Sequence, residues 1–251
     1  MSDFLLFVCI GFAAQLVDGA IGMAYGLIGT STLLSIGIPP ATASASIHAA
    51  EVFTTCASGL SHWRLKNIDW KLVRRLAPAG MVGGFVGAYI LATNASGWLS
   101  LVIALYLTGM GAIVLRRGLR KFSENPHPPK HIQVLGFFGG LLDSIGGGGW
   151  GPLVTTNLMG QGTHPRMAIG STSLSEFFVT FVISCTFMMT IGLELWPIIT
   201  GLVIGGVLAA PIAAYAAKHL PAKILMVGVG CIIILLSIRT VIITGSEVFA
   251  S

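Results

Sequence analysis

The feature that most constrains the fold of this chain is a series of eight apolar stretches, each long enough to reach across a membrane. They occupy about residues 4–36, 40–61, 72–93, 97–115, 132–161, 166–192, 196–217 and 221–244. A crossing helix needs about 20 mainly apolar residues, and lipid offers backbone polar groups no partner outside the helix. Only 9% of the residues are charged, against roughly 25% in a soluble domain. The sequence therefore predicts an all-α integral membrane protein and excludes a soluble fold.

Most basic residues lie in two loops between these stretches. The loops span residues 64–75 and 116–130, and they hold ten of the fourteen Lys and Arg residues. Basic loops that flank apolar spans usually lie on the cytoplasmic side. We therefore interpret the net charge of +5 as a topology signal and expect no nucleic-acid partner. The prediction is a multi-pass protein of the cell inner (plasma) membrane with both loops in the cytoplasm.

The two halves of the chain repeat each other. Residues 11–55 align without a gap with residues 136–180, at a constant offset of 125 (143 − 18), and 15 of the 45 aligned pairs are identical. Unrelated apolar sequences would match at roughly one position in ten, given their skewed composition. The identical pairs include Asp18/Asp143, Gly22/Gly147, Gly26/Gly151, Thr30/Thr155, Pro40/Pro165, Ser46/Ser171, Glu51/Glu176 and Thr55/Thr180. The chain is therefore predicted to be an internal duplication.

The first and fifth stretches are predicted to be broken helices. One contains DGAIGMAYG from Asp18 and the other DSIGGGGWGP from Asp143. Each glycine in a helix interior costs about 1 kcal/mol relative to alanine, and Pro152 suits the first turn of a new half-helix. Paired broken helices in two repeats indicate a transporter site.

Two topologies are open for the duplication. If every stretch crosses once, the repeats are parallel and Lys218 and Lys223 fall outside. If the broken stretches are re-entrant, the repeats are inverted, with Arg166 and both lysines inside and Glu194 outside, which fits the charge rule better. We favour inverted repeats, each with a broken or re-entrant first helix plus about three spanning helices. The expected division is repeat 1 over residues 1–117, a basic cytoplasmic linker over 118–131 and repeat 2 over 132–251.

Buried acids are the candidates for proton coupling. Asp18, Asp143, Glu51 and Glu176 lie in apolar stretches, where a charge costs about 2.5–3.5 kcal/mol. One or more of them could titrate during transport, whereas the alternative for the aspartates is that they cap free amides at the helix breaks. His48 lies one helical turn before Glu51 and is a further candidate for proton exchange, with a purely structural buried histidine as the alternative.

The glycine breaks are the candidates for anion binding. The N-terminus of a half-helix presents free N–H groups and a partial positive charge. Arg166 could add a charge-assisted contact, although a snorkelling interfacial arginine is an equal alternative. The substrate-binding candidates are Gly22, Tyr25 and Ser46 in the first half, and Gly146, Gly147, Gly148, Gly149, Trp150, Thr155, Asn157, Arg166 and Ser171 in the second. No catalytic residue, metal ligand or cofactor is predicted.

The sequence resembles the TauE/SafE sulfite-exporter family (TSUP membrane transporters). The resemblance is carried by LVDGAIGMAYGLIGTSTLLSIGIPPATASASIHAAEVFTT and by GGLLDSIGGGGWGPLVTTNLMGQGTHPRMAIGSTSLSEFFVT, and it covers both repeats. It implies a bacterial inner-membrane carrier, not an enzyme, that exports small sulfur-containing anions of the sulfite, sulfonate or sulfoacetate type, with proton coupling.

Two other functions stay open from the residues alone. The four acids could serve a carrier for metal or other cations, although His, Asp, Met and Cys do not cluster at ligand spacing as such a carrier would need. A membrane-embedded hydrolase would need a nucleophile and a base close together, and His127 and His131 have no such companions. The partners expected are a small anion and the lipid bilayer, and a homo-oligomer is left open.

Overall fold

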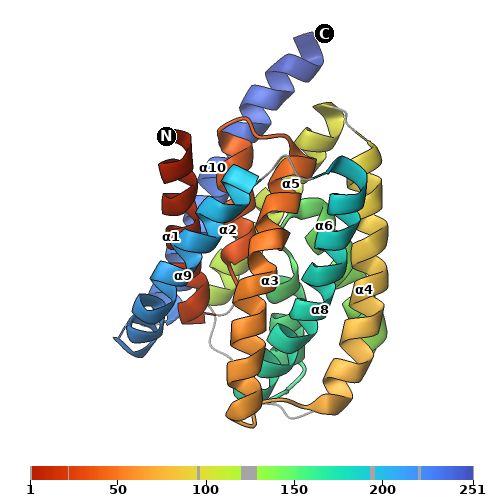
Figure 1. Ribbon diagram of the computed structural model, residues 1–251, viewed down its shortest axis with the longest axis vertical. Helices are drawn as coiled ribbons and strands as arrows, with labels where there is room; N and C mark the ends of the chain where they lie inside the picture. Colours follow the sequence, from red (N-terminus) through yellow and green to blue (C-terminus); the bar gives the residue numbers. More distant parts are fainter. Residues whose placement is uncertain are drawn as a thin grey trace.

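The computed structural model describes residues 2–21, 23–94, 97–119, 129–192, 196–219 and 222–250. This part of the chain forms a bundle of helices without strands (Figure 1), so the predicted all-α fold is confirmed. The elements are α1 (Ser2–Ile21), α2 (Tyr25–Ser35), α3 (Pro40–Arg64), α4 (Trp70–Thr93), α5 (Gly97–Leu119), α6 (Ile132–Gly146), the π-helical turn η1 (Gly151–Thr155), α7 (Thr156–Gly160), α8 (Pro165–Ile191), α9 (Trp196–His219) and α10 (Ala222–Ala250).

The first helix of each half is broken, as the sequence predicts. A gap after Ile21 separates α1 from α2, and a gap after Gly146 separates α6 from η1. Gly147 ends α6 with a φ of 63°, a left-handed conformation that glycine adopts without steric cost. Pro152 lies in the first turn of η1, where the missing N–H of proline sacrifices no helical hydrogen bond.

The second broken unit is a hairpin that returns to the end of the molecule where it begins. The backbone N–H of Lys130, just before α6, donates to Oε1 of Gln161, just after α7, at 2.5 Å. The first unit behaves alike in Figure 1, where α1 descends from the N-terminus and α2 leads back towards that end. At the end of α2, Nη1 of Arg239 in α10 donates to the carbonyl oxygen of Ser35, the last residue of α2.

Corresponding helices of the two halves make corresponding contacts. Helix α1 packs against α9, while α6, the counterpart of α1, packs against α4, the counterpart of α9. The pairs α3 with α8 and α5 with α10 join counterparts directly. Glycines permit the close approaches: a Cβ on Gly83 of α4 would overlap the carbonyl oxygen of Phe137 in α6, and one on Gly205 of α9 would overlap that of Val8 in α1. Small residues serve close helix packing in this way in membranes.

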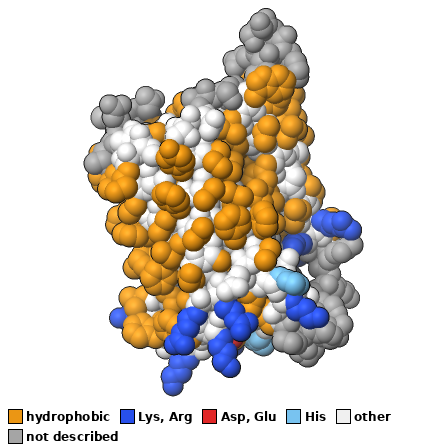
Figure 2. Space-filling view, turned by 90° about the vertical axis from the view of Figure 1, so that its right-hand side faces the viewer, with side chains coloured by type: hydrophobic (Ala, Val, Ile, Leu, Met, Phe, Trp, Pro, Cys, Tyr) orange, Lys and Arg blue, Asp and Glu red, His pale blue; other side chains and the backbone are white. Residues whose placement is uncertain are grey.

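The surface is apolar over most of its height. Figure 2 shows hydrophobic side chains over the upper and middle parts of one face and Lys and Arg gathered at the lower end. Four of the described helical segments are long and apolar enough to cross a membrane: Trp70–Thr93, Trp98–Leu119, Arg166–Ile191 and Met226–Ser246. The chain is therefore a multi-pass membrane protein. Of the predicted linker over 118–131, residues 120–128 lie outside the described part of the chain, as does Glu194.

Candidate functional site

The two helix breaks meet each other inside the bundle. A Cβ on Gly26, in the first turn of α2, would lie 2.8 Å from Cα of Gly148 in the second break. A Cβ on Gly151 would likewise lie 2.7 Å from Cα of Met23 in the first break. The offset of 125 converts Gly26 into Gly151 and Met23 into Gly148, so each contact is the counterpart of the other. The breaks therefore lie where the two repeats face each other.

A cavity of about 10 Å³ lies between the breaks, which is room for about one water molecule. All four predicted buried acids line it, and none of the described lining residues is Lys or Arg. Its walls are Asp18, Met23, Ala24, Tyr25, Gly26, Leu27, Glu51, Asp143, Gly148, Gly149, Gly151, Pro152 and Glu176. In this conformation the cavity is too small to hold anything larger than a water molecule.

The aspartates cap the second half-helices, so the capping alternative is confirmed for both. Oδ1 of Asp18 accepts the backbone N–H groups of Ala24 at 2.7 Å and Tyr25 at 3.2 Å. Oδ1 of Asp143 accepts those of the corresponding residues, Gly149 at 2.7 Å and Trp150 at 3.0 Å. A carboxylate at this position satisfies amides that have no helical partner and complements the helix dipole. The same cap in both repeats explains why the aspartate recurs with the glycines.

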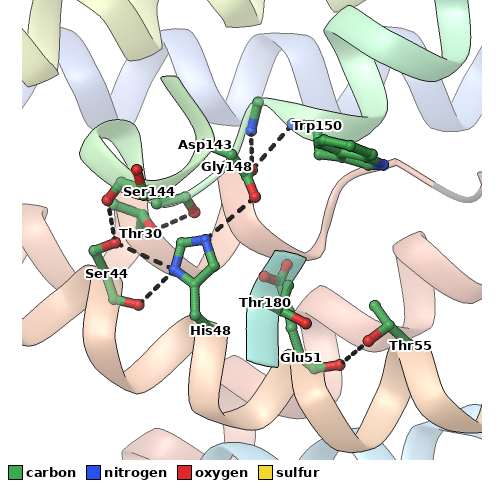
Figure 3. A network of polar contacts seen from close by, with 12 residues as sticks. Thr30, Ser44, His48, Glu51, Thr55, Asp143, Ser144, Gly148, Trp150 and Thr180 are labelled. Carbon is green, nitrogen blue, oxygen red and sulfur yellow. Dashed lines mark hydrogen bonds and ion pairs between the residues drawn. The ribbon is translucent and has the colours of Figure 1, made fainter. Parts of the chain in front are cut away.

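His48 reaches from α3 to the second break (Figure 3). Its Nε2 lies 3.2 Å from Oδ2 of Asp143, and its Nδ1 lies 2.7 Å from the carbonyl oxygen of Ser44 and 3.2 Å from the Ser44 hydroxyl. That hydroxyl donates its own proton to the carbonyl oxygen of Ser144 at 2.6 Å. The His48 side chain is fully buried, and its bond to Asp143 joins the first repeat to the second.

The two glutamates face the same cavity from helices that pack together. Glu51 of α3 is 5% exposed, and its Oε2 has no hydrogen-bond partner among the described residues. Its Oε1 lies 3.1 Å from where a Cβ on Gly26 would stand. Glu176 lines the cavity from α8. A buried carboxylate oxygen without a partner is costly, so Glu51 is the acid with most to gain from a proton or a ligand.

The two aromatic residues of the breaks differ in their relation to the cavity. The Trp150 ring is fully buried, its Nε1 donates to the carbonyl oxygen of Thr172 at 3.2 Å, and it packs on Gly80 of α4. The Tyr25 hydroxyl donates to the carbonyl oxygen of Leu202 in α9 at 3.2 Å. The Trp150 ring therefore anchors the second break to α4 of the first half, and the Tyr25 hydroxyl anchors the first break to α9 of the second half. Tyr25 also lines the cavity, whereas Trp150 is not among the lining residues.

Several predicted binding residues lie away from the cavity. Ser46 donates to the carbonyl oxygen of Thr42 in its own helix, and the Ser171 hydroxyl accepts the backbone N–H of Asp69 at 2.8 Å. Thr155, Asn157 and Arg166 are not among the lining residues, nor are Gly146 and Gly147. Thr155 donates to Thr172, Asn157 accepts from Gln161, and Arg166 is exposed. Gly22 lies outside the described residues.

Two side chains that hold the second break were not among the predicted residues. Thr30 of α2 donates from Oγ1 to the carbonyl oxygen of Gly147 at 2.6 Å. Tyr106 of α5 donates from its hydroxyl to the carbonyl oxygen of Gly148 at 3.3 Å. A signal existed for Thr30, because it is one of the residues repeated identically 125 positions later. Tyr106 has no such signal, since it comes from a helix outside the aligned segment.

Comparisons with known proteins agree with the resemblance seen in the sequence. The family model described as "Sulfite exporter TauE/SafE" matches residues 7–240. The chain is 40% identical to the "Probable membrane transporter protein YtnM" of Bacillus subtilis (strain 168), over 96% of this chain and 84% of that protein. It is 23% identical to a "Probable membrane transporter protein" of Haemophilus influenzae (strain ATCC 51907 / DSM 11121 / KW20 / Rd), over 94% of this chain and 97% of that protein. No solved structure matches.

Proposed function

The chain belongs to the sulfite exporter TauE/SafE family of membrane transporters, which are not enzymes, and we propose that it exports a small sulfur-containing anion across the inner membrane with proton coupling. The anion is of the sulfite, sulfonate or sulfoacetate type. It binds between the two helix breaks, and the buried carboxylates and His48 manage the protons.

The observation that carries this proposal is the meeting of two half-helix N-termini at a buried cavity. Each half-helix directs the positive end of its dipole and its first amides towards the cavity, and such ends bind anions. Both breaks are already matched with a carboxylate, since Asp18 and Asp143 hold the first amides. The same amides could therefore bind an oxyanion group of the substrate, and the aspartate carboxylates occupy that position in its absence.

Alternating access through inverted repeats is the transport route that we propose. The hairpins formed by the broken helices and the exchanged helix contacts support a two-fold relation in the membrane plane. The end that carries Arg64 and Arg75 then lies in the cytoplasm. The loop between α3 and α4 belongs to this end and contacts the start of α8, where Ser171 bonds Asp69. Rocking of one repeat against the other would open the cavity to each side in turn.

The test is uptake of labelled sulfite, and of a labelled sulfonate, into tight proteoliposomes holding the purified chain, with and without a pH gradient. Flux that needs the protein and responds to the gradient is the expected result. Flux of neither anion, through protein shown to be folded, would overturn the proposed substrate class. Reversing the gradient should reverse the net flux, because a coupled carrier is driven by its coupling ion.

A cation carrier is the second candidate, and one observation favours it. Four carboxylates face the cavity, and the described lining residues include no basic side chain, so unneutralised acids would repel an anion. No group of three or more His, Cys, Asp and Glu among the described residues is arranged to hold a metal ion. Thermal unfolding with oxyanions, monovalent cations and divalent metals separates the candidates, because a ligand that binds the folded state stabilises it.

A further inference from the structure

Asp143 of the second helix break pairs with a histidine of α3, whereas Asp18 of the first break has no such partner among the described residues. Asp18 and Asp143 cap their half-helices in the same way. His48 bonds Asp143, whereas the position 125 residues after His48 is Ser173. The two aspartates therefore make the same capping contacts, but only Asp143 has a histidine with which it can share a proton.

The hydrogen bonds of His48 fix how many protons the pair holds. Nδ1 of His48 faces the carbonyl oxygen of Ser44 at 2.7 Å, which can only accept, so Nδ1 carries a hydrogen. The contact of Nε2 with Oδ2 of Asp143 at 3.2 Å then requires one proton between the two atoms. The pair is either imidazolium with carboxylate or neutral imidazole with carboxylic acid. Both forms have no net charge, so either can take up one further proton.

The other oxygen of Asp143 occupies the donors that a substrate anion would use. Its Oδ1 accepts the N–H groups of Gly149 and Trp150, and Gly149 lines the cavity. A carboxylate is a stronger acceptor than a neutral carboxyl group. Adding one proton to the pair gives imidazolium and carboxylic acid, which weakens the hold of Asp143 on these amides and leaves the pair with one positive charge.

Resting on the proposed function, we propose that His48 and Asp143 exchange a proton for substrate: protonation of the pair frees the amides of Gly149 and Trp150, and an oxyanion group of the substrate takes them. One proton enters with one negative charge, so the occupied site gains no net charge. Deprotonation returns the carboxylate to the amides and expels the anion.

The surroundings of the pair favour proton exchange over an ion pair between the substrate anion and a Lys or Arg side chain. The titratable groups that face it are Asp18 of α1, Tyr25 of α2, Glu51 of α3, Tyr106 of α5 and Glu176 of α8. All are acids, and no described Lys or Arg lines the cavity. An anion can therefore find positive charge here only in the amide dipoles and in protons brought to the site.

The test measures the affinity of the purified full chain for methanesulfonate from about pH 8 to about pH 6. A sulfonate stays anionic over this range, whereas sulfite itself takes up a proton. The wild-type affinity should rise by up to about ten-fold per pH unit, as linkage to one proton requires. His48→Gln keeps a donor towards Asp143 without titrating, and Asp143→Asn keeps a neutral acceptor for the amides. In both variants the affinity should change by less than about two-fold per pH unit.

His62→Gln is the matched control, because His62 lies in the same helix but bonds Asn67 at 3.3 Å, away from the cavity. It should keep the wild-type pH dependence. A wild-type slope in either His48→Gln or Asp143→Asn would overturn the proposal. So would the absence of proton uptake when methanesulfonate binds the wild-type protein in weak buffer, a measurement that needs no variant. Failure of the wild type to bind methanesulfonate or sulfite at any pH would instead remove the proposed function, and this inference with it.

Discussion

At the scale of single residues, the four acids that line the cavity divide into two kinds. Asp18 and Asp143 each accept two backbone amides, so they have a structural task whatever else they do. Glu51 has a buried oxygen without a partner among the described residues, and Glu176 reaches the same cavity from α8. The glutamates are therefore the acids whose presence the fold itself does not explain.

Neutralising either glutamate should impair transport and leave the fold intact. We expect Glu51→Gln and Glu176→Gln to lower gradient-driven anion uptake by at least about ten-fold, or about 1.4 kcal/mol. The midpoint of thermal unfolding should stay level or rise, because the cost of a buried charge is removed. Asp69→Asn is the control, since Asp69 caps α4 outside the cavity and Asn caps equally well. Wild-type uptake by both glutamate variants would remove the glutamates from the coupling scheme.

Thr30 should matter more to stability than a neighbouring threonine of the same helix. Thr30→Val removes the hydrogen bond to Gly147 that ties α2 to the second break. Thr32→Val removes only a bond to Ile28 within α2. Hydrogen bonds between helices in membranes contribute about 0.6 kcal/mol, with a maximum of about 1.7, so Thr30→Val should lower the unfolding free energy by that amount. Equal losses in the two variants, measured in one detergent, would contradict the role given to Thr30.

At the scale of elements, the broken helices could be predicted from the sequence, but the walls of the cavity only in part. The repeated aspartate and glycines were sufficient to predict the breaks, because glycine destabilises a helix at its own position whatever the rest of the fold. Ser46 and Ser171 are predicted substrate-binding residues, yet neither lines the cavity. Ser46 bonds Thr42 within α3, and Ser171 bonds the loop before α4. Trp150 was assigned by its place in the motif, although its ring packs on α4. Which face of a helix meets which neighbour depends on contacts that are distant in the sequence.

The close contact between the breaks leaves no room for a methyl group. A Cβ on Gly26 would lie 2.6 Å from the carbonyl oxygen of Gly147, so Gly26→Ala must push the breaks apart. Overpacking of this kind costs about 1–3 kcal/mol, and we expect a lower unfolding midpoint together with loss of transport. Gly109→Ala in α5 is the control, because nothing lies within 4 Å of its Cβ position and alanine is the better helix former. Unimpaired transport by Gly26→Ala would show that the breaks need not approach each other.

At the scale of the whole molecule, the duplication explains how one short motif makes a site. Neither hairpin could bury its break alone, because the break exposes backbone groups that lipid cannot satisfy. Each break is covered by the other, through Gly26 against Gly148 and Gly151 against Met23. The repeats differ at this point, because Gly148 and Gly149 correspond in the alignment to Met23 and Ala24. The two breaks thus share their capping aspartates, yet the site is chemically one-sided, because among the described residues only Asp143 is bonded to a histidine.

The orientation of the repeats in the membrane is tested by two corresponding loops. Ile36 follows α2 and Gln161 follows α7, and they correspond at the offset of 125. In a background with Cys9, Cys56, Cys185 and Cys231 replaced, Ile36→Cys and Gln161→Cys are each exposed to a membrane-impermeant thiol reagent in oriented vesicles. Inverted repeats place corresponding loops on opposite sides, so Gln161→Cys should react from the cytoplasmic side and Ile36→Cys from the other. Reaction of both from one side would mean parallel repeats. A two-fold axis along the membrane normal cannot exchange the two faces, so the inward-open and outward-open states would then not be related by exchange of the two repeats, and alternating access would depend on one half rocking against the other.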